Sequence, residues 1–325
     1  MLKTIVIGAG RISLSHLPHI INHPGIELVS IIEPNFITRL LIKRLTRIKT
    51  VKSIDEISIA NYDCAFILTP PSSHFIISKK LLDKGKHVFI EKPLSLDPSN
   101  SKSLLSIAKK KKLRLSVGYV YRFHPIYIEL KNLLESHTYG VPRESKIDMI
   151  GNVISKSTPI SWRNTGIGSG CLYDYGCHVI DLSFYFFGKP DSVKCLSKEE
   201  IYQEKVIDKF RAKFTFKNLK DFNSYIYCNW ADETVRKASI NIEVRTSKNT
   251  ITCDGQTIYI VGETNKSISI KDLDTNVNYY LRGEEFQLQL EDFINNINRK
   301  SDSYSSAEEA VICDEYISKL YRESL

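Results

Sequence analysis

The sequence lacks the features that mark membrane-spanning, secreted and repetitive proteins. It has no apolar run long enough to cross a bilayer, and the apolar stretch at residues 2–7 is too short for the core of a signal peptide. Internal repeats and low-complexity linkers are also missing. We therefore expect a soluble globular protein with no membrane partner.

Cysteine patterns of the kind that build disulfide frameworks or zinc sites are missing too. The seven cysteines form an odd set without regular spacing, and no CxxC pair occurs. Cys171, Cys177 and His178 are close in sequence, but adjacent residues such as Cys177 and His178 point to different sides of a helix. We expect free thiols, a cytoplasmic location and no bound metal.

Basic residues outnumber acidic ones, giving a formal net charge of +8. The densest basic run, residues 109–112 with Arg114, follows an apolar segment and is interpreted as a solvated helix end, where cations suit the helix dipole. Nucleic acid is therefore not an expected partner. The basic balance instead suits an anionic substrate or cofactor.

At 325 residues, with 42% hydrophobic and 25% charged residues, the chain can form two globular domains. In the first third, strands are predicted at residues 2–7, 27–32, 64–68, 87–90 and 113–119, separated by helical segments such as 75–84. This alternation predicts an α/β domain over residues 1–120, a Rossmann doubly wound parallel sheet that binds ligands at the carboxyl ends of its strands.

A glycine turn follows the first predicted strand. Gly8 permits the tight turn and Gly10 lets backbone amides approach a pyrophosphate. The helix that begins near Arg11 and Ile12 offers its N-terminal dipole to the phosphates. The third glycine of the usual motif is replaced by Ser13, which leaves the phosphate contacts possible.

Glu33 ends the second predicted strand, 23 positions after Gly10. A dinucleotide fold places there the acid that bonds the adenosine ribose 2′-hydroxyl. A carboxylate at this position repels a 2′-phosphate, so we expect NAD as the cofactor in preference to NADP.

Lys92 stands between Glu91 and Pro93, directly after the apolar run 87–90. A lysine before proline is ordinarily a solvated turn residue, because proline holds its predecessor in an extended conformation. At the carboxyl end of a parallel strand, however, the same lysine places a cation beside a bound cofactor.

The remainder, residues 121–325, has a different pattern of predicted helices and strands. Helices are predicted at residues 124–135, 286–293 and 306–320, and strands at 209–216, 224–230, 239–245 and 250–260. We expect an α+β domain for substrate binding and oligomerisation, with a large, mostly antiparallel open sheet and C-terminal helices able to pack back on the first domain. An open sheet needs one face covered, which predicts a homodimer or homotetramer formed through this sheet.

Asp174 and His178 follow a flexible glycine loop at residues 166–170. If the segment is helical, the two side chains share one face, and the carboxylate can orient a histidine suited to proton transfer. A core histidine paired with Asp181, three residues further on, explains the pattern equally well.

Several motifs occur in order along the chain: Gly8-Ala9-Gly10 with His16, residues 69–74 (Thr-Pro-Pro-Ser-Ser-His), residues 85–93 ending in Glu91-Lys92-Pro93, Tyr121-Arg122-Phe123, Ser161-Trp162-Arg163 and residues 174–178. Together they resemble the Gfo/Idh/MocA oxidoreductase family. The resemblance implies an N-terminal Rossmann domain, a C-terminal domain with a large open sheet, and oxidation or reduction of a carbinol carbon of sugars, inositols or nucleotide-linked sugars with NAD or NADP. Ser13 and Ser169 depart from the commonest family pattern.

The resemblance also implies site residues. The catalytic set would be Lys92, Asp174 and His178. Cofactor contacts would fall at Gly8, Gly10, Arg11, Ile12, Glu33, Thr69, Pro70, His74, Glu91 and Lys92. The substrate pocket would include Tyr119, Arg122, Arg163 and Tyr175, since arginine binds carboxylates and phosphates bidentately. A structural stack of Arg163 on Trp162 is the alternative for that arginine.

These residues predict an NAD-dependent oxidoreductase acting on a sugar or nucleotide-linked sugar, with His178 and Lys92 handling the proton at the reacting oxygen. An inositol or other polyol dehydrogenase is a related alternative. A catalytically silent, NAD-binding regulatory protein of the same fold is an alternative from another class.

Overall fold

The computed structural model describes residues 1–155, 158–159, 161–166, 168–219, 222–273, 283–298 and 305–323. This chain divides into two compact units. The first contains the residues up to Val120, helix α7 and the start of helix α8 as far as Asp314; the second contains the residues from Tyr121 to the end of the large sheet, and the rest of α8. In the described ranges, no helix is both long enough and apolar enough to cross a membrane, and all seven cysteines are free and buried.

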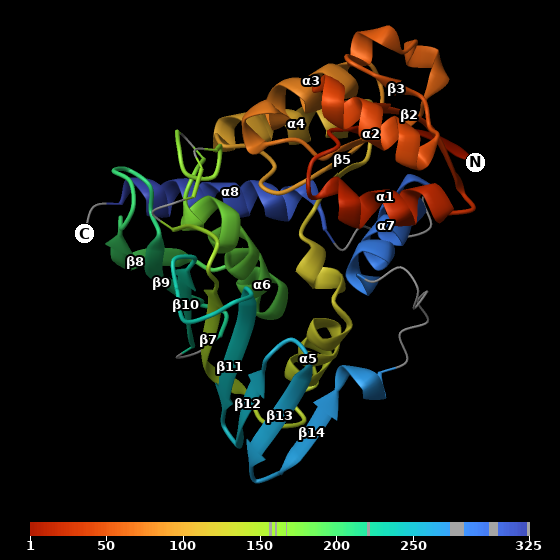
Figure 1. The fold of residues 1–325 in the computed structure, drawn as a ribbon. Coiled ribbons are helices and arrows are strands. Elements are labelled where there is room, and N and C mark those ends of the chain that lie inside the picture. The colour runs from red at the N-terminus through yellow and green to blue at the C-terminus, as the bar shows by residue number, and fades with distance from the viewer. Residues whose placement is uncertain are drawn as a thin grey trace. The chain divides into compact units, whose positions relative to one another are not determined.

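The first unit is built on a six-stranded parallel sheet (Figure 1). Its strands are β1 (Leu2–Ile7), β2 (Ile26–Ile32), β3 (Thr50–Val51), β4 (Cys64–Ile67), β5 (His87–Ile90) and β6 (Leu115–Val117). Their order is β3-β2-β1-β4-β5-β6, and every neighbouring pair is parallel. This is the strand order of a dinucleotide-binding fold, so the predicted doubly wound sheet is confirmed.

Helices complete this unit. They are α1 (Ser13–Asn22), α2 (Phe36–Thr46), α3 (His74–Asp83), α4 (Pro98–Lys111), α7 (Glu284–Ile297) and the part of α8 (Ala307–Arg322) up to Asp314, with short 3₁₀ turns η1 (Ile54–Glu56), η2 (Ile59–Asn61) and η3 (Pro71–Ser73). Helix α7 packs against α1, and its Leu290, Phe293 and Ile294 join the apolar core that Phe66 and Phe89 form in the sheet. A segment distant in sequence therefore closes the core of the nucleotide-binding unit.

The second unit is built on an eight-stranded sheet. Its strands are β7 (Pro142–Ile150), β8 (Ser192–Glu199), β9 (Lys209–Thr215), β10 (Asn223–Asn229), β11 (Ser239–Thr246), β12 (Asn249–Cys253), β13 (Thr257–Gly262) and β14 (Lys266–Ser269). The order is β14-β13-β12-β11-β7-β10-β9-β8; β7 and β10 are parallel and the other neighbours are antiparallel. The expected mostly antiparallel sheet is confirmed.

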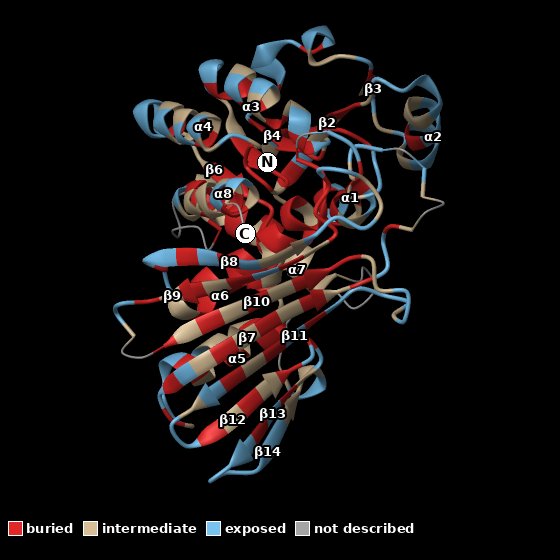
Figure 2. Ribbon diagram, turned by 90° about the vertical axis from the view of Figure 1, so that its left-hand side faces the viewer, coloured by how far each residue is buried: buried red, intermediate tan, exposed pale blue. Residues whose placement is uncertain are grey.

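One face of this sheet is buried and the other is more exposed. Buried and part-exposed residues alternate along β7, β9 and β10, as Figure 2 shows. Helix α6 (Cys177–Phe187) contacts β7 and β10, and helix α5 (Pro125–Glu135) contacts β13. The remaining short elements are η4 (Val120–Phe123), the π-helical turn η5 (Leu172–Gly176) and η6 (Ile270–Asp272).

Two predicted segments differ from the structure. Residues 250–260, expected as one strand, form the hairpin of β12 and β13, because the Asp254 carboxylate accepts the N–H groups of Gln256 and Thr257 and Gly255 takes a φ of 84°. The strand expected at residues 113–119 is limited to Leu115–Val117, since the chain turns into η4 directly afterwards.

Candidate active site

The glycine loop lies between β1 and α1. Gly8 has a φ of 97°, and a Cβ atom there would lie 2.7 Å from the Leu68 carbonyl oxygen, so a larger residue does not fit. A Cβ on Gly10 would meet nothing within 4 Å, which leaves open space for a ligand to approach the backbone. Ser13, at the third glycine position, donates its hydroxyl to the Gly10 carbonyl at 2.6 Å. The loop therefore keeps the form that a pyrophosphate needs, and Arg11 and Ile12 lead into α1.

The Glu33 carboxylate faces this loop from the end of β2. Its two oxygens accept the N–H groups of Ala9, at 2.9 Å, and of Asn35, at 2.8 Å. A fixed carboxylate beside the glycine loop is the arrangement that holds an adenosine ribose in dinucleotide-binding folds. The loop and Glu33 together fit a dinucleotide.

His74 connects two loops at the carboxyl ends of the strands. It is fully buried at the start of α3, with Nδ1 2.8 Å from the Pro93 carbonyl oxygen and Nε2 2.9 Å from that of Thr69. Burial lowers the pKa of His74, and a neutral imidazole has one N–H, so it donates to only one of these two carbonyl oxygens. The ring lies between the loop of Thr69 and Pro70 and the residue that follows Lys92.

Glu91 supports the other side of Lys92. One carboxylate oxygen lies 2.8 Å from His16 Nε2, and the other accepts the Lys92 N–H at 3.3 Å. A Cβ on Gly118 would lie 2.9 Å from the same carboxylate, so glycine is needed there. The peptide bond between Lys92 and Pro93 is cis. Lys92 thus stands between a buried acid and a loop held by a buried imidazole.

In the second unit, Asp174 and His178 lie on one continuous helical segment, the π turn η5 followed by α6. Arg163 Nε donates to Asp174 Oδ2 at 3.1 Å, and the Asp174 side chain is 12% exposed. The His178 ring meets the Tyr121 ring edge-on, with 4.8 Å between ring centroids. The predicted helix is present, and its first turn has the π geometry often found at functional sites.

Asp181, the alternative partner considered for His178, forms a buried ion pair with Arg122. Arg122 Nη2 lies 2.7 Å from Asp181 Oδ1, and neither side chain is more than 3% exposed. The guanidinium also lies over the Tyr185 ring, 5.5 Å from its centroid. Arg122 therefore has a structural role in this unit, and contact with a substrate remains a prediction.

The other expected substrate residues differ in exposure. Tyr119 and Tyr175 are buried, and the Tyr175 ring meets Trp230 edge-on. Arg163 stacks over the Trp162 ring at 4.9 Å, as the structural alternative anticipated, while it also bonds Asp174. Their contacts with a substrate remain predictions.

Sequence reasoning missed two contacts at Asp174 and His178. It did not connect Arg163 with Asp174, because the two come from different segments, and it did not place Tyr121 beside His178. The motif Tyr121-Arg122-Phe123 was the sequence signal that could have indicated Tyr121 as a residue near the site. Within the described ranges, no group of three or more His, Cys, Asp or Glu residues could hold a metal ion.

The strand order, glycine loop and Glu33 define a dinucleotide-binding α/β protein. Residues 2–119 match the model of the oxidoreductase family with an NAD-binding Rossmann fold, and residues 127–252 match the GFO/IDH/MocA C-terminal domain. The chain belongs to the GFO/IDH/MocA oxidoreductase family.

Curated relatives include the glucose-6-phosphate 3-dehydrogenase of Bacillus subtilis, 27% identical over 58% of this chain and 54% of the relative. The UDP-N-acetylglucosamine 3-dehydrogenase of Acidithiobacillus ferrooxidans is 25% identical over 60% of this chain and 58% of the relative. The chain spans about half the length of the curated relatives that it matches.

Solved structures share the fold over almost the whole chain. The Acidithiobacillus enzyme superposes with a TM-score of 0.80 at 20% identity, covering 98% of this chain and 96% of that one. A levoglucosan dehydrogenase in complex with NADH gives a TM-score of 0.87 at 19% identity, with the same coverage.

Proposed function

We propose that the protein is an NAD-dependent oxidoreductase that converts a carbinol and a keto group of a sugar or nucleotide-linked sugar into one another. Residues 1–120 would bind the cofactor and residues 121–325 the substrate. The observation that carries the proposal is the set Lys92, Asp174 and His178, present in a family member whose glycine loop and Glu33 fit a dinucleotide.

The chemistry follows from the side chains. The cofactor would accept a hydride at its nicotinamide ring as NAD⁺ and supply one as NADH. His178 takes the hydroxyl proton when a carbinol is oxidised and returns it when a ketone is reduced, because imidazole titrates near neutral pH. Lys92 stabilises negative charge on the same oxygen. Asp174, with its carboxylate held by Arg163, bonds a neighbouring hydroxyl or orients His178.

Two considerations support the proposed cofactor and substrate. The Glu33 carboxylate repels a 2′-phosphate, which supports NAD over NADP. Two relatives are named as 3-dehydrogenases of a phosphorylated and of a nucleotide-linked sugar, which supports substrates of these kinds. Arg163, 36% exposed beside Asp174, is suited to bind an anionic group on such a substrate.

The proposal is tested by mixing the purified protein with NAD or NADH and a panel of UDP-sugars, sugar phosphates, free sugars, inositols and their keto forms, and by following the absorbance of the reduced cofactor. Turnover of a sugar or UDP-sugar supports it, and turnover of inositol alone makes the protein a polyol dehydrogenase. If NADH binds but no member of the panel reacts, the regulatory alternative is favoured.

A further inference from the structure

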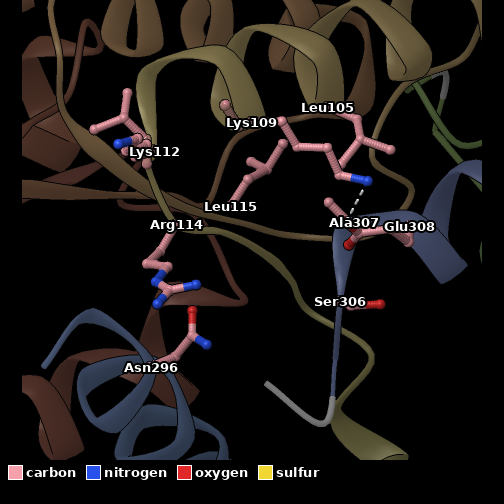
Figure 3. Close-up of a pocket in the computed structure, with 11 residues that line it drawn as sticks. Leu105, Lys109, Lys112, Arg114, Leu115, Asn296, Ser306, Ala307 and Glu308 are labelled. Atoms are coloured by element: carbon pink, nitrogen blue, oxygen red, sulfur yellow. Dashed lines mark ion pairs between the residues drawn. The ribbon is translucent and has the colours of Figure 1, made fainter. Parts of the chain in front are cut away.

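The basic run at residues 109–112, which the proposed function does not use, borders a cavity in the first unit (Figure 3). The cavity has a volume of about 750 Å³. It is formed by the end of α4, the start of β6, the end of α7 and the start of α8. Leu115, on its wall, begins β6, so the cavity lies at the amino end of that strand. The glycine loop and Glu33 follow the carboxyl ends of β1 and β2.

Cations surround this cavity and exceed the acidic groups. Lys109, Lys112 and Arg114 line it, together with one carboxylate, Glu308. Lys109 Nζ lies 2.9 Å from Glu308 Oε1, the ion pair drawn as a dashed line in Figure 3. Neutralising Lys109 in this way still leaves Lys112 and Arg114, so the lining has a net positive charge.

Hydrogen-bond donors add to this charge. Helix α8 begins at Ala307 on the cavity wall, and the Ser306 hydroxyl oxygen accepts the Glu309 N–H at 3.4 Å. The N–H groups of Ala307 and Glu308 have no acceptor within the helix. At the end of α4, the Lys112 N–H caps the carbonyl groups of Ala108 and Lys109, which reduces the negative potential of that helix end.

The lining combines apolar side chains with a buried amide and the charged groups described above. Ala108, Leu115 and Ala307 are buried, and the Asn296 side chain, in a residue only 5% exposed, points toward Arg114 (Figure 3). The cavity volume falls in the range of roughly 300–1,000 Å³ typical of small-molecule sites, which is more space than a lone phosphate needs. The lining therefore suits a ligand with an uncharged body and phosphate groups at the rim.

We propose that this cavity is a second binding site, for a phosphorylated small metabolite, separate from the dinucleotide site. Phosphate groups would bind Lys112, Arg114 and the first amides of α8, and the uncharged body would lie against Leu115 and Asn296. The site does not depend on the identity of the sugar substrate.

Calorimetry with inorganic pyrophosphate, at low salt and with NADH saturating the dinucleotide site, tests the proposal. Pyrophosphate should bind with a dissociation constant below millimolar. Lys112→Gln and Arg114→Gln should each weaken binding about tenfold, while Arg114→Lys should have a smaller effect. The matched control is Lys110→Gln, which removes a charge from the same run outside the cavity lining.

Thermal unfolding of the unliganded variants verifies that each one folds. If a glutamine variant does not fold, the smaller loss of pyrophosphate affinity in Arg114→Lys still tests the role of Arg114. Two results would overturn the proposal. One is the absence of pyrophosphate binding at millimolar concentration. The other is an equal loss with Lys110→Gln and Lys112→Gln, which would indicate a diffuse basic surface; binding of an oligonucleotide alone would point to nucleic acid instead.

Discussion

At the scale of single residues, Glu33 is the residue that we propose sets which dinucleotide the first unit accepts. Its carboxylate is fixed by two backbone N–H groups beside the glycine loop. The carboxylate would therefore repel a 2′-phosphate, because it cannot rotate away from it. The Glu33→Gln variant keeps an acceptor oxygen and removes the charge. We expect it to weaken NAD binding and to raise the ratio of NADP to NAD affinity about tenfold or more. Fluorescence titration with both reduced cofactors measures this ratio.

Glu27→Gln, an exposed change at the start of the same strand, is the matched control and should leave both affinities unchanged. An unchanged cofactor ratio in Glu33→Gln would remove Glu33 from the determinants of cofactor choice.

Gly151 leaves the space that the Tyr175 hydroxyl occupies. A Cβ added at Gly151 would lie 2.2 Å from the Tyr175 hydroxyl oxygen. Gly151→Ala should therefore displace Tyr175, which lies between Asp174 and Gly176 in the π turn, and lower the free energy of unfolding by about 1–3 kcal/mol. Urea denaturation measures this change.

Tyr175→Phe provides the control, because it removes the oxygen that the new methyl group would meet. The Tyr175 hydroxyl is buried and has no hydrogen-bond partner in the described chain. The single change should cost little, and the double variant should recover much of the stability lost in Gly151→Ala. A Gly151→Ala protein as stable as wild type would contradict this packing.

Among the elements, α8 carries a buried acid. The Asp314 carboxylate accepts the Ser95 N–H at 3.0 Å and the Ser101 hydroxyl at 2.6 Å, which ties α8 to α4 and to the segment after Lys92. Burial raises the pKa of Asp314 to about 7, from an ordinary value of 3.8. Between these values the folded chain binds a proton that the unfolded chain has lost, so this group lowers stability as the pH rises toward 7.

Asp314→Asn keeps the acceptor oxygen and cannot ionise. The unfolding free energy of the wild type should fall by about 2–3 kcal/mol between pH 5 and pH 8 because of this group, since one pKa unit is about 1.4 kcal/mol. Asp314→Asn should not show this fall. Denaturation series at several pH values measure the two slopes. Glu308→Gln, an exposed change in the same helix, should keep the wild-type slope; parallel slopes for Asp314→Asn and wild type would show that Asp314 does not titrate in this range.

Local patterns predicted most elements but not their interruptions. Buried strands such as β1 and β4 were predictable from apolar runs, and α4 from its periodicity and basic end. The hairpin at Asp254 and Gly255 was missed because the apolar character of residues 250–260 masked the short turn at residues 254–256. The π turn before His178 has no sequence signal of its own. Its Gly176 lies against Phe210, where an added Cβ would be 2.8 Å from the ring, and this contact joins residues that are distant in sequence.

On the scale of the whole molecule, the open sheet of the second unit predicts self-association. Its more exposed face carries Arg211 over Tyr227 and Lys213 over Tyr225. Covering this face in a homodimer or homotetramer is the simplest arrangement for a large open sheet. Light scattering coupled to size-exclusion chromatography should give twice or four times the monomer mass, and Tyr227→Glu should lower it. A wild-type monomer at micromolar concentration would contradict this expectation.

Contacts between residues distant in sequence could not be predicted from the sequence. Gly8, Glu33 and Lys92 were identified because spacing relative to a strand fixes their positions. The contacts of α7 with the first core, and of Asp314 with Ser95, join residues more than 200 positions apart. Such contacts depend on the complete fold, so no local pattern contains them.

The central claim is that His178 exchanges a proton with the substrate while the first unit binds the cofactor. The most direct test is the turnover number of His178→Asn on the substrate found in the panel, measured together with its NADH dissociation constant. Turnover should fall by about 100-fold or more and NADH affinity should stay within about twofold. The exposed control His137→Asn should leave both unchanged. A His178→Asn protein that turns over substrate at the wild-type rate would contradict the account.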